Sequence, residues 1–109
     1  MKQYNMGEFE ELVLLVVAAL DSEGYGVNIQ ETLTEQARKN ISLSAVHVAL
    51  KRLSDKGFVK SKMGGITEER GGRRKKFYTI TALGKKMIDA QYTLRNALYQ
   101  QIPKLNYAR

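Results

Sequence analysis

The side chains that could perform chemistry are few, and they do not form a catalytic or metal-binding constellation. The chain of 109 residues contains one histidine, His47, and no cysteine. These numbers exclude disulfides, cysteine-based zinc sites and sites built from several histidines. Glu68 and Glu69 are adjacent acids, but they fall in a predicted exposed loop with no apolar wall to desolvate them. The sequence therefore predicts a protein that is not an enzyme and that needs no metal or cofactor.

Two glycine pairs, at 64–65 and 71–72, raise the question of a phosphate-binding loop. Gly65 and Gly71 enclose five residues, one more than the nucleotide-binding motif has, and no Gly-Lys-Ser/Thr follows. The glycines are therefore interpreted as turn residues, because a residue without a Cβ adopts positive φ easily.

Positive charge is concentrated in one segment, residues 51–76. This segment holds ten lysines and arginines against three acids, a balance of +7, which equals the net charge of the whole chain. Such clustering on one structural unit is typical of a surface that binds phosphates. The alternative interpretation is a solvated face with spare lysines. We expect a nucleic acid to be the partner of this segment.

The basic segment lies within a longer stretch, residues 41–78, whose pattern predicts helix, turn, strand, loop and strand. After a serine cap, Ser42 or Ser44, three apolar residues recur with the period of an amphipathic helix: Val46, Leu50 and Leu53. Gly57 is expected to end this helix. Strands are expected over 58–63 and 75–80, with a loop over 64–74 between them. This order is that of a winged helix, a helix-turn-helix followed by a β-hairpin wing.

Three further helices are expected outside this stretch. The first begins at residue 7 and ends near residue 20, and it is apolar nearly all round, so we expect it to be buried against two neighbours. Its longest apolar run has nine residues, too few to span a membrane, and it has no signal-peptide features. The second, over about 27–39, would be the first helix of the helix-turn-helix. The last is capped by Thr81 and ends before Pro103.

At 43% hydrophobic and 27% charged residues, the chain is predicted to form one globular unit in two parts. Residues 1–80 would be the winged-helix DNA-binding domain, and residues 81–109 a C-terminal dimerisation helix with a tail. A helix of roughly 30 Å is too long to be covered by the small body. Its apolar stripe either folds back on its own domain or, as we expect, meets a second subunit. The expected interface residues are Phe9, Leu12, Val16, Leu83, Met87, Leu94, Leu98 and Ile102.

Four segments together resemble the PadR family of bacterial transcriptional regulators, over about residues 7–88: GEFEELVLLVVAAL, YGV, ISLSAVHVALKRLSDKGFV and ERGGRRKKFYTITALGKK. The resemblance implies a winged-helix dimer that binds a palindromic operator and usually represses transcription. The chain is similar to the short branch of the family, which has a single C-terminal helix. His47 stands where the family often has tyrosine. Some relatives hold an effector in an aromatic sandwich that can include tryptophan; this chain has no tryptophan, and no effector site is assigned.

The expected DNA contacts come from the helix over 43–56 and from the wing. On a helical wheel, Ser44, Val48, Lys51 and Asp55 point away from the core, with His47 and Arg52 on the flanks. Asp55 is left out because it would repel the DNA backbone. Val48 is expected to touch a thymine methyl and Lys51 a guanine or a phosphate, while the wing contacts phosphates. The full set is Ser42, Ser44, His47, Val48, Lys51, Arg52, Lys60, Lys62, Arg70, Arg73, Arg74, Lys75 and Lys76.

The sequence thus predicts a mainly α fold with a small β-hairpin, a winged helix-turn-helix followed by a long dimerisation helix. The predicted function is that of a cytoplasmic, sequence-specific DNA-binding regulator, a dimeric repressor that binds an inverted-repeat operator. Its partners would be double-stranded DNA and a second copy of the chain, with no membrane. The alternatives are a protein-interaction module or an RNA-binding module that uses the same basic face.

Overall fold

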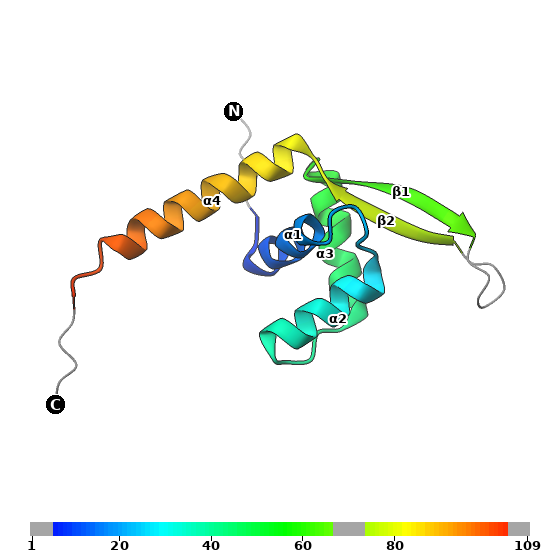
Figure 1. The fold of residues 1–109 in the computed structure, drawn as a ribbon, viewed down its shortest axis with the longest axis horizontal. Coiled ribbons are helices and arrows are strands. Elements are labelled where there is room, and N and C mark those ends of the chain that lie inside the picture. The colour runs from blue at the N-terminus through cyan, green and yellow to red at the C-terminus, as the bar shows by residue number, and fades with distance from the viewer. Residues whose placement is uncertain (1–5, 67–73, 105–109) are drawn as a thin grey trace.

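The computed structural model describes residues 6–66 and 74–104. Three helices come first, then a hairpin, then a long helix (Figure 1). The elements are α1 (Glu8–Ala19), α2 (Gly26–Ala37), α3 (Leu43–Asp55), β1 (Val59–Ile66), β2 (Arg74–Ile80) and α4 (Ala82–Gln100). The predicted order of elements and the fold class are confirmed. No helix among the described residues has the length and apolarity needed to cross a membrane.

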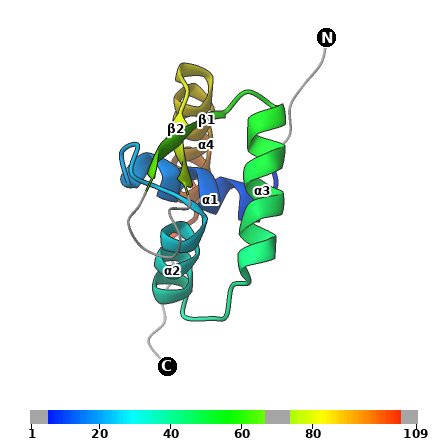
Figure 2. The same cartoon turned by 90° about the vertical axis from the view of Figure 1, so that its right-hand side faces the viewer.

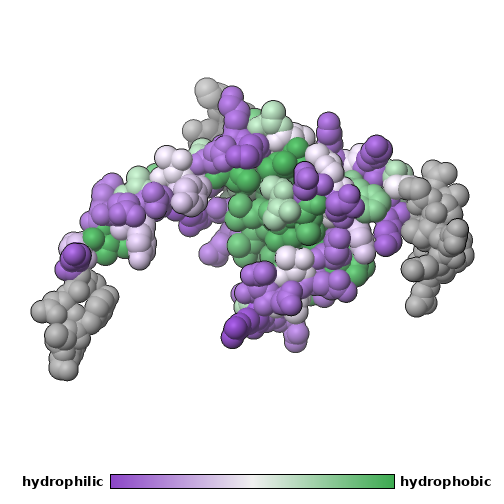
Figure 3. Space-filling view, viewed as in Figure 1, coloured by the Kyte–Doolittle hydropathy of each residue, from purple (hydrophilic) through white to green (hydrophobic). Residues whose placement is uncertain are grey.

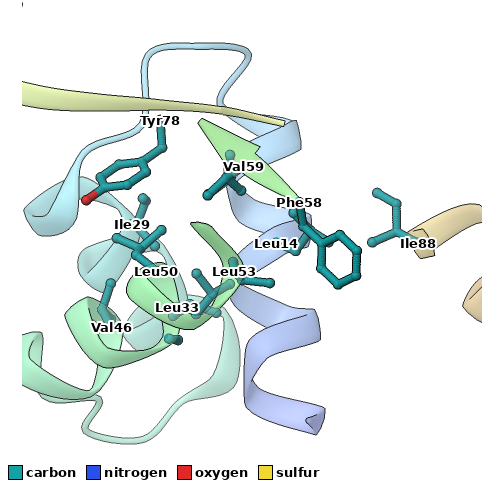
Figure 4. Close-up of a cluster of buried hydrophobic side chains, with 13 residues drawn as sticks. Leu14, Ile29, Leu33, Val46, Leu50, Leu53, Phe58, Val59, Tyr78 and Ile88 are labelled. Atoms are coloured by element: carbon teal, nitrogen blue, oxygen red, sulfur yellow. The ribbon is translucent and has the colours of Figure 1, made fainter. Parts of the chain in front are cut away.

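One hydrophobic core joins α1, α2, α3 and the base of the hairpin (Figure 4). The predicted α3 stripe is fully buried in it, and Ala49 adds a fourth buried position from the same helix. The core residues are Val13, Leu14, Val17, Ile29, Leu33, Val46, Ala49, Leu50, Leu53, Phe58, Val59, Tyr78 and Ile88.

The ends of α3 are set by local hydrogen bonds. Ser42, not Ser44, is the N-cap, because its Oγ accepts a hydrogen bond from the Ala45 amide at 3.1 Å. At the other end Gly57 adopts φ +81°, and the chain turns so that the Phe58 amide donates to the Leu53 carbonyl at 2.9 Å. Phe58 was expected to begin the strand, but it precedes β1 as a fully buried core residue.

The hairpin is longer than the sequence predicts. Antiparallel pairing runs from Val59↔Ile80 to Met63↔Lys76 and then, after a register shift, to Ile66↔Arg74. The glycine at 64 was interpreted as part of a turn, but it lies within β1 against the ring of Phe77, where a Cβ would collide with that ring. The missing side chain therefore permits close packing inside the strand at this position.

The start of α4 is tied to the body, and the rest leaves it. Thr81 Oγ1 accepts from the Gly84 amide at 3.0 Å and donates to the Gly57 carbonyl at 2.6 Å. Gly84 lies so close to the Phe58 carbonyl that no larger residue would fit, and Ile88 is the last buried residue of the helix. Beyond it, α4 extends away from the body, in the direction opposite to the hairpin (Figure 1).

Candidate nucleic-acid interface

The solvent side of α3 carries the predicted reading residues. Ser44 and His47 are exposed, Val48 is 52% exposed, and the side chain of Lys51 is 77% exposed. Figure 2 shows α3 along one edge of the body, with the hairpin beside it. The helix therefore has a row of accessible side chains that no other described element covers.

Lys51 is paired along its own helix. Its Nζ lies 3.3 Å from Asp55 Oδ2, one turn further on, and both side chains are exposed. An exposed pair of this kind contributes little, roughly 0.3–0.5 kcal/mol. Lys51 can therefore leave Asp55 for a stronger acceptor at small cost.

Arg52 lies on the flank of α3 that faces α1. Its Nη1 is 3.7 Å from Glu10 Oε2, and Lys56 Nζ is 2.6 Å from Glu10 Oε1. Glu10 is a buried carboxylate. The two cations hold α3 against α1, so at least part of the charge of Arg52 is used inside the protein.

Val48 and Arg52 also line a hollow of about 460 Å³ together with residues 7–10 of the α1 N-terminus. His47, on the other flank of α3, lines a different hollow of about 240 Å³. We call the second one the junction hollow, because it lies where α2, α3 and β2 meet. Its lining consists of Tyr25, Gly26, Val27, His47, Lys75, Lys76 and Tyr78. The predicted α3 contacts are thus divided between two flanks of the helix.

The hairpin distributes its lysines over two faces. Lys60 is opposite Thr79 and Lys62 is opposite Phe77, and since side chains alternate along a strand these residues share one face. That face lines a third hollow with Ser22 and Glu23. Lys76 pairs with Met63 on the other face, the face of the core residues Val59 and Tyr78.

The wing is anchored to the helix-turn-helix through the residues before α2. The Tyr78 amide donates to the Gly24 carbonyl at 2.8 Å, so this segment forms an isolated antiparallel bridge with β2. The Tyr25 ring meets Phe77 edge-on at 5.6 Å between centroids, and Lys75 Nζ lies 4.2 Å from the centre of the Tyr25 ring. The sequence predicts only a connection between the helix that ends near residue 20 and the helix that begins near residue 27, so this anchor was not foreseen. The only signal was a tyrosine between two glycines.

Burial raises the pKa of Tyr78 above its ordinary value, so its phenol stays neutral at physiological pH beside Lys75 and Lys76. No group of three or more potential metal ligands occurs among the described residues. Of the predicted wing contacts, Arg70 and Arg73 lie outside the described residues, as do Glu68 and Glu69, and for Arg74 the structure describes only the backbone, at the start of β2.

A family model described as the transcriptional regulator PadR-like family matches residues 13–90. The chain belongs to this family. Its members are transcription regulators and not enzymes, which confirms the predicted class of protein. No curated protein matches the sequence.

Solved structures of PadR proteins share the fold. A PadR-like transcription factor from Bacteroides fragilis is 21% identical with a TM-score of 0.70, and the match covers 87% of this chain and 86% of that one. A PadR family regulator from Clostridium difficile is 24% identical, TM-score 0.69, with 86% and 93% covered. Bacillus subtilis PadR in complex with operator DNA is 21% identical, TM-score 0.63, with 93% of this chain but 52% of that one covered.

In this PadR-like regulator the predicted dimer residues fall into two groups. Phe9, Val16 and Met87 are half-buried against the protein's own core. The others are exposed: Leu12, Leu83, Leu94, Leu98 and Ile102, to which α1 adds Leu15. Figure 3, which views the molecule from the same side as Figure 1, shows apolar surface over α1 at the centre of that side.

One ion pair joins α4 to α1 beyond the buried first turns of α4 in the PadR-like regulator. Arg95 Nη2 lies 3.0 Å from Glu11 Oε1, whose side chain is only 14% exposed. Glu10 and Glu11 are neighbours in the first turn of α1, and one binds α3 while the other binds α4. The first turn of α1 therefore contacts both α3 and α4.

Proposed function

We propose that this PadR-like regulator is a sequence-specific DNA-binding repressor that acts as a homodimer on an inverted-repeat operator. The observation that carries the proposal is the open row on α3 directly beside a basic hairpin. A helix with a free polar face next to a cationic wing suits a major groove flanked by phosphates. The related Bacillus subtilis PadR is described with its operator DNA. Binding to chromosomal DNA would place the protein in the cytoplasm.

Within the row, Ser44, Val48 and Lys51 read base edges. Val48 contacts a thymine methyl, and Lys51 leaves Asp55 to donate to guanine or to a phosphate. Ser42, His47 and Arg52 stand at the margins of this surface. The wing residues Lys75 and Lys76, with Arg70, Arg73 and Arg74, supply phosphate contacts.

Lys60 and Lys62 have a different place in this proposal. They lie on the hairpin face away from the core, with Ser22 and Glu23. They therefore contribute to the general positive field and contact phosphates only where DNA bends around the wing.

Assembly through α4 gives the two reading helices a fixed separation. The exposed apolar residues of α4 and α1 have no partner among the described residues, and a second copy offers the same residues. In the dimer the two α3 helices lie about 34–36 Å apart, which matches successive major grooves on one face of the duplex.

Selection of bound duplexes from a random pool with the purified protein tests the function directly. An enriched inverted repeat is expected, with affinity that falls steeply as salt rises. Enrichment of single-stranded RNA, or binding to an acidic protein with no preference among duplexes, would favour the alternative modules instead.

Two sets of substitutions distinguish a contact with base edges from contacts with phosphates. Lys51→Ala is expected to cost about 1–3 kcal/mol on the selected site and less on random DNA. Arg73→Ala with Arg74→Ala should weaken all duplexes alike and lower the salt slope by about one per lost contact. Lys86→Ala, an exposed lysine of α4, is the charge-matched control. An equal loss on both DNAs for Lys51→Ala would make Lys51 a phosphate contact.

A further inference from the structure

The junction hollow brings together two lysines and the single histidine, from two elements that are distant in sequence. His47 comes from α3, and Lys75 and Lys76 come from β2, while Gly26 of α2 forms the wall beside His47. Its volume of about 240 Å³ is sufficient for one compact anionic group such as a phosphate. The hollow is open to solvent on the side where α3 and the hairpin lie next to each other.

Gly26 fixes the position of the His47 ring. A Cβ built on Gly26 would lie 2.7 Å from His47 Cε1 and 3.0 Å from Nε2. The imidazole therefore rests directly on the backbone of α2, with its Cε1–Nε2 edge against Gly26 and the residue lining the junction hollow. Gly26 is needed here for this close approach, since any side chain would displace the ring.

The described side chains that line the hollow around His47 are either basic or uncharged. Lys75 and Lys76 approach from β2, Tyr25 from the start of α2, and Tyr78, kept neutral by burial, from β2. On α3 itself, Lys51 lies one turn away and has its own acid in Asp55. No carboxylate is among the described residues that line the hollow. An anion entering it would thus meet two lysines, His47 and two tyrosine hydroxyls beside the apolar Val27, and no opposing negative charge among the described residues.

Histidine is the side chain whose charge changes most readily between about pH 5 and 8. A bound phosphate favours the protonated ring, because an opposite charge at hydrogen-bonding distance stabilises the cation. We infer that the junction hollow seats one phosphate of the DNA backbone and that His47 binds it as the imidazolium, so that duplex binding takes up one proton. This inference rests on the proposed function and adds a site and a pH dependence to it.

The affinity of a fluorescently labelled duplex of random sequence, measured at constant salt between about pH 5 and 8, tests the inference. We expect about tenfold tighter binding at the acid end, the size of one hydrogen bond to a charged group. The chain has a single histidine, so a change of affinity with pH in this range can be assigned to His47. His47→Gln keeps a hydrogen-bond donor without a titrating charge. Whatever its affinity at high pH, this variant should show no gain in affinity on acidification.

Two further measurements distinguish a specific phosphate site in the junction hollow from a general effect of positive charge on DNA affinity. In proton NMR the Cε1–H signal of His47 should titrate at higher pH once the duplex is added. Gly26→Ala keeps the histidine but pushes its ring out of the hollow, and it should lose the pH-dependent gain. A thermal unfolding midpoint close to that of the wild type shows that this variant is folded.

The possible outcomes distinguish the inference from the function on which it rests. Salt-dependent binding with no pH slope and an unmoved His47 signal overturns the inference and leaves the function intact. A slope seen only on the selected operator makes His47 a base contact and also overturns the phosphate seat. Failure to bind any duplex at any pH overturns the proposed function, and the inference with it.

Discussion

The helices α3 and α4 have similar apolar stripes but opposite surroundings. In α3 the stripe Val46, Leu50 and Leu53 is fully buried in the chain's own core. In α4 only Gly84 and Ile88 are buried, and Leu94 and Leu98 are each 55% exposed. A repeating apolar pattern therefore identifies a face that must be covered, but it does not say whether the cover comes from the same chain.

The difference follows from where each helix is held. α3 lies between α1, α2 and the hairpin and is tied to α1 through Glu10. α4 is held at its first turns by Gly84 and further along by Glu11. Apart from the contact of Arg95 with Glu11, the outer half of α4 is exposed. Substitutions in the compact body and in the outer part of α4 should therefore have different effects.

The largest effect is expected from charges placed in the α4 stripe. Leu94→Glu with Leu98→Glu would bury carboxylates without partners in the proposed dimer seam, at about 3–5 kcal/mol for an uncompensated charge. Light scattering should show monomers, with helical content retained by circular dichroism. Asn96→Glu with Gln100→Glu, exposed positions on the other side of α4, is the matched control. A wild type that is monomeric at micromolar concentration would show that this stripe does not mediate assembly.

Truncation of one leucine in each helix compares the two regions directly. Leu50→Ala removes a fully buried side chain and should lower the free energy of unfolding by about 2–5 kcal/mol. Leu94→Ala should act mainly through assembly, so its effect should shrink as the protein is diluted. Urea unfolding at two protein concentrations separates the two cases. A concentration-independent loss of similar size for Leu94→Ala would place that residue in the core of a single chain.

The two neighbouring acids of α1 sharpen the comparison. Glu10→Gln leaves Lys56 without its closest carboxylate in a partly buried site. We expect a loss of about 2–3 kcal/mol, below the roughly 3–5 found for fully buried pairs. Glu11→Gln breaks the contact with the exposed Arg95 and should cost at most about 1 kcal/mol. Thermal unfolding of both variants shows which one loses more stability. Equal losses would mean that α4 is held as firmly as α3.

The smallest effect concerns a polar atom inside the body. Thr34 Oγ1 is a buried side-chain oxygen with no hydrogen-bond partner in the described part of the chain. Thr34→Val should therefore be neutral or stabilise by up to about 1 kcal/mol. The control is Thr32→Val on the same helix, because Thr32 Oγ1 donates to the Asn28 carbonyl at 2.8 Å. A clear loss of stability in Thr34→Val would show that its hydroxyl has a partner in solution.

Much of the architecture could be predicted because it depends on neighbours along the chain. The α3 stripe, the Gly57 stop and the Thr81 cap are all confirmed. Helix periodicity and capping act within a few residues, so a sequence window contains the whole cause. The β1 end was predicted too early, since the role of Gly64 depends on the Phe77 ring across the strand pair.

By itself, the sequence determined the class of the protein: a small winged helix whose excess positive charge lies on one segment, with a long amphipathic helix after it. Only the tertiary structure decided which positive side chains are free to contact DNA and which are already engaged inside the protein. It placed Arg52 against the buried Glu10, Lys75 over the Tyr25 ring, and His47 on Gly26 at the mouth of a hollow. These contacts join residues from separate elements. Electrostatics and packing act through space, and no local pattern records which segments will be brought together.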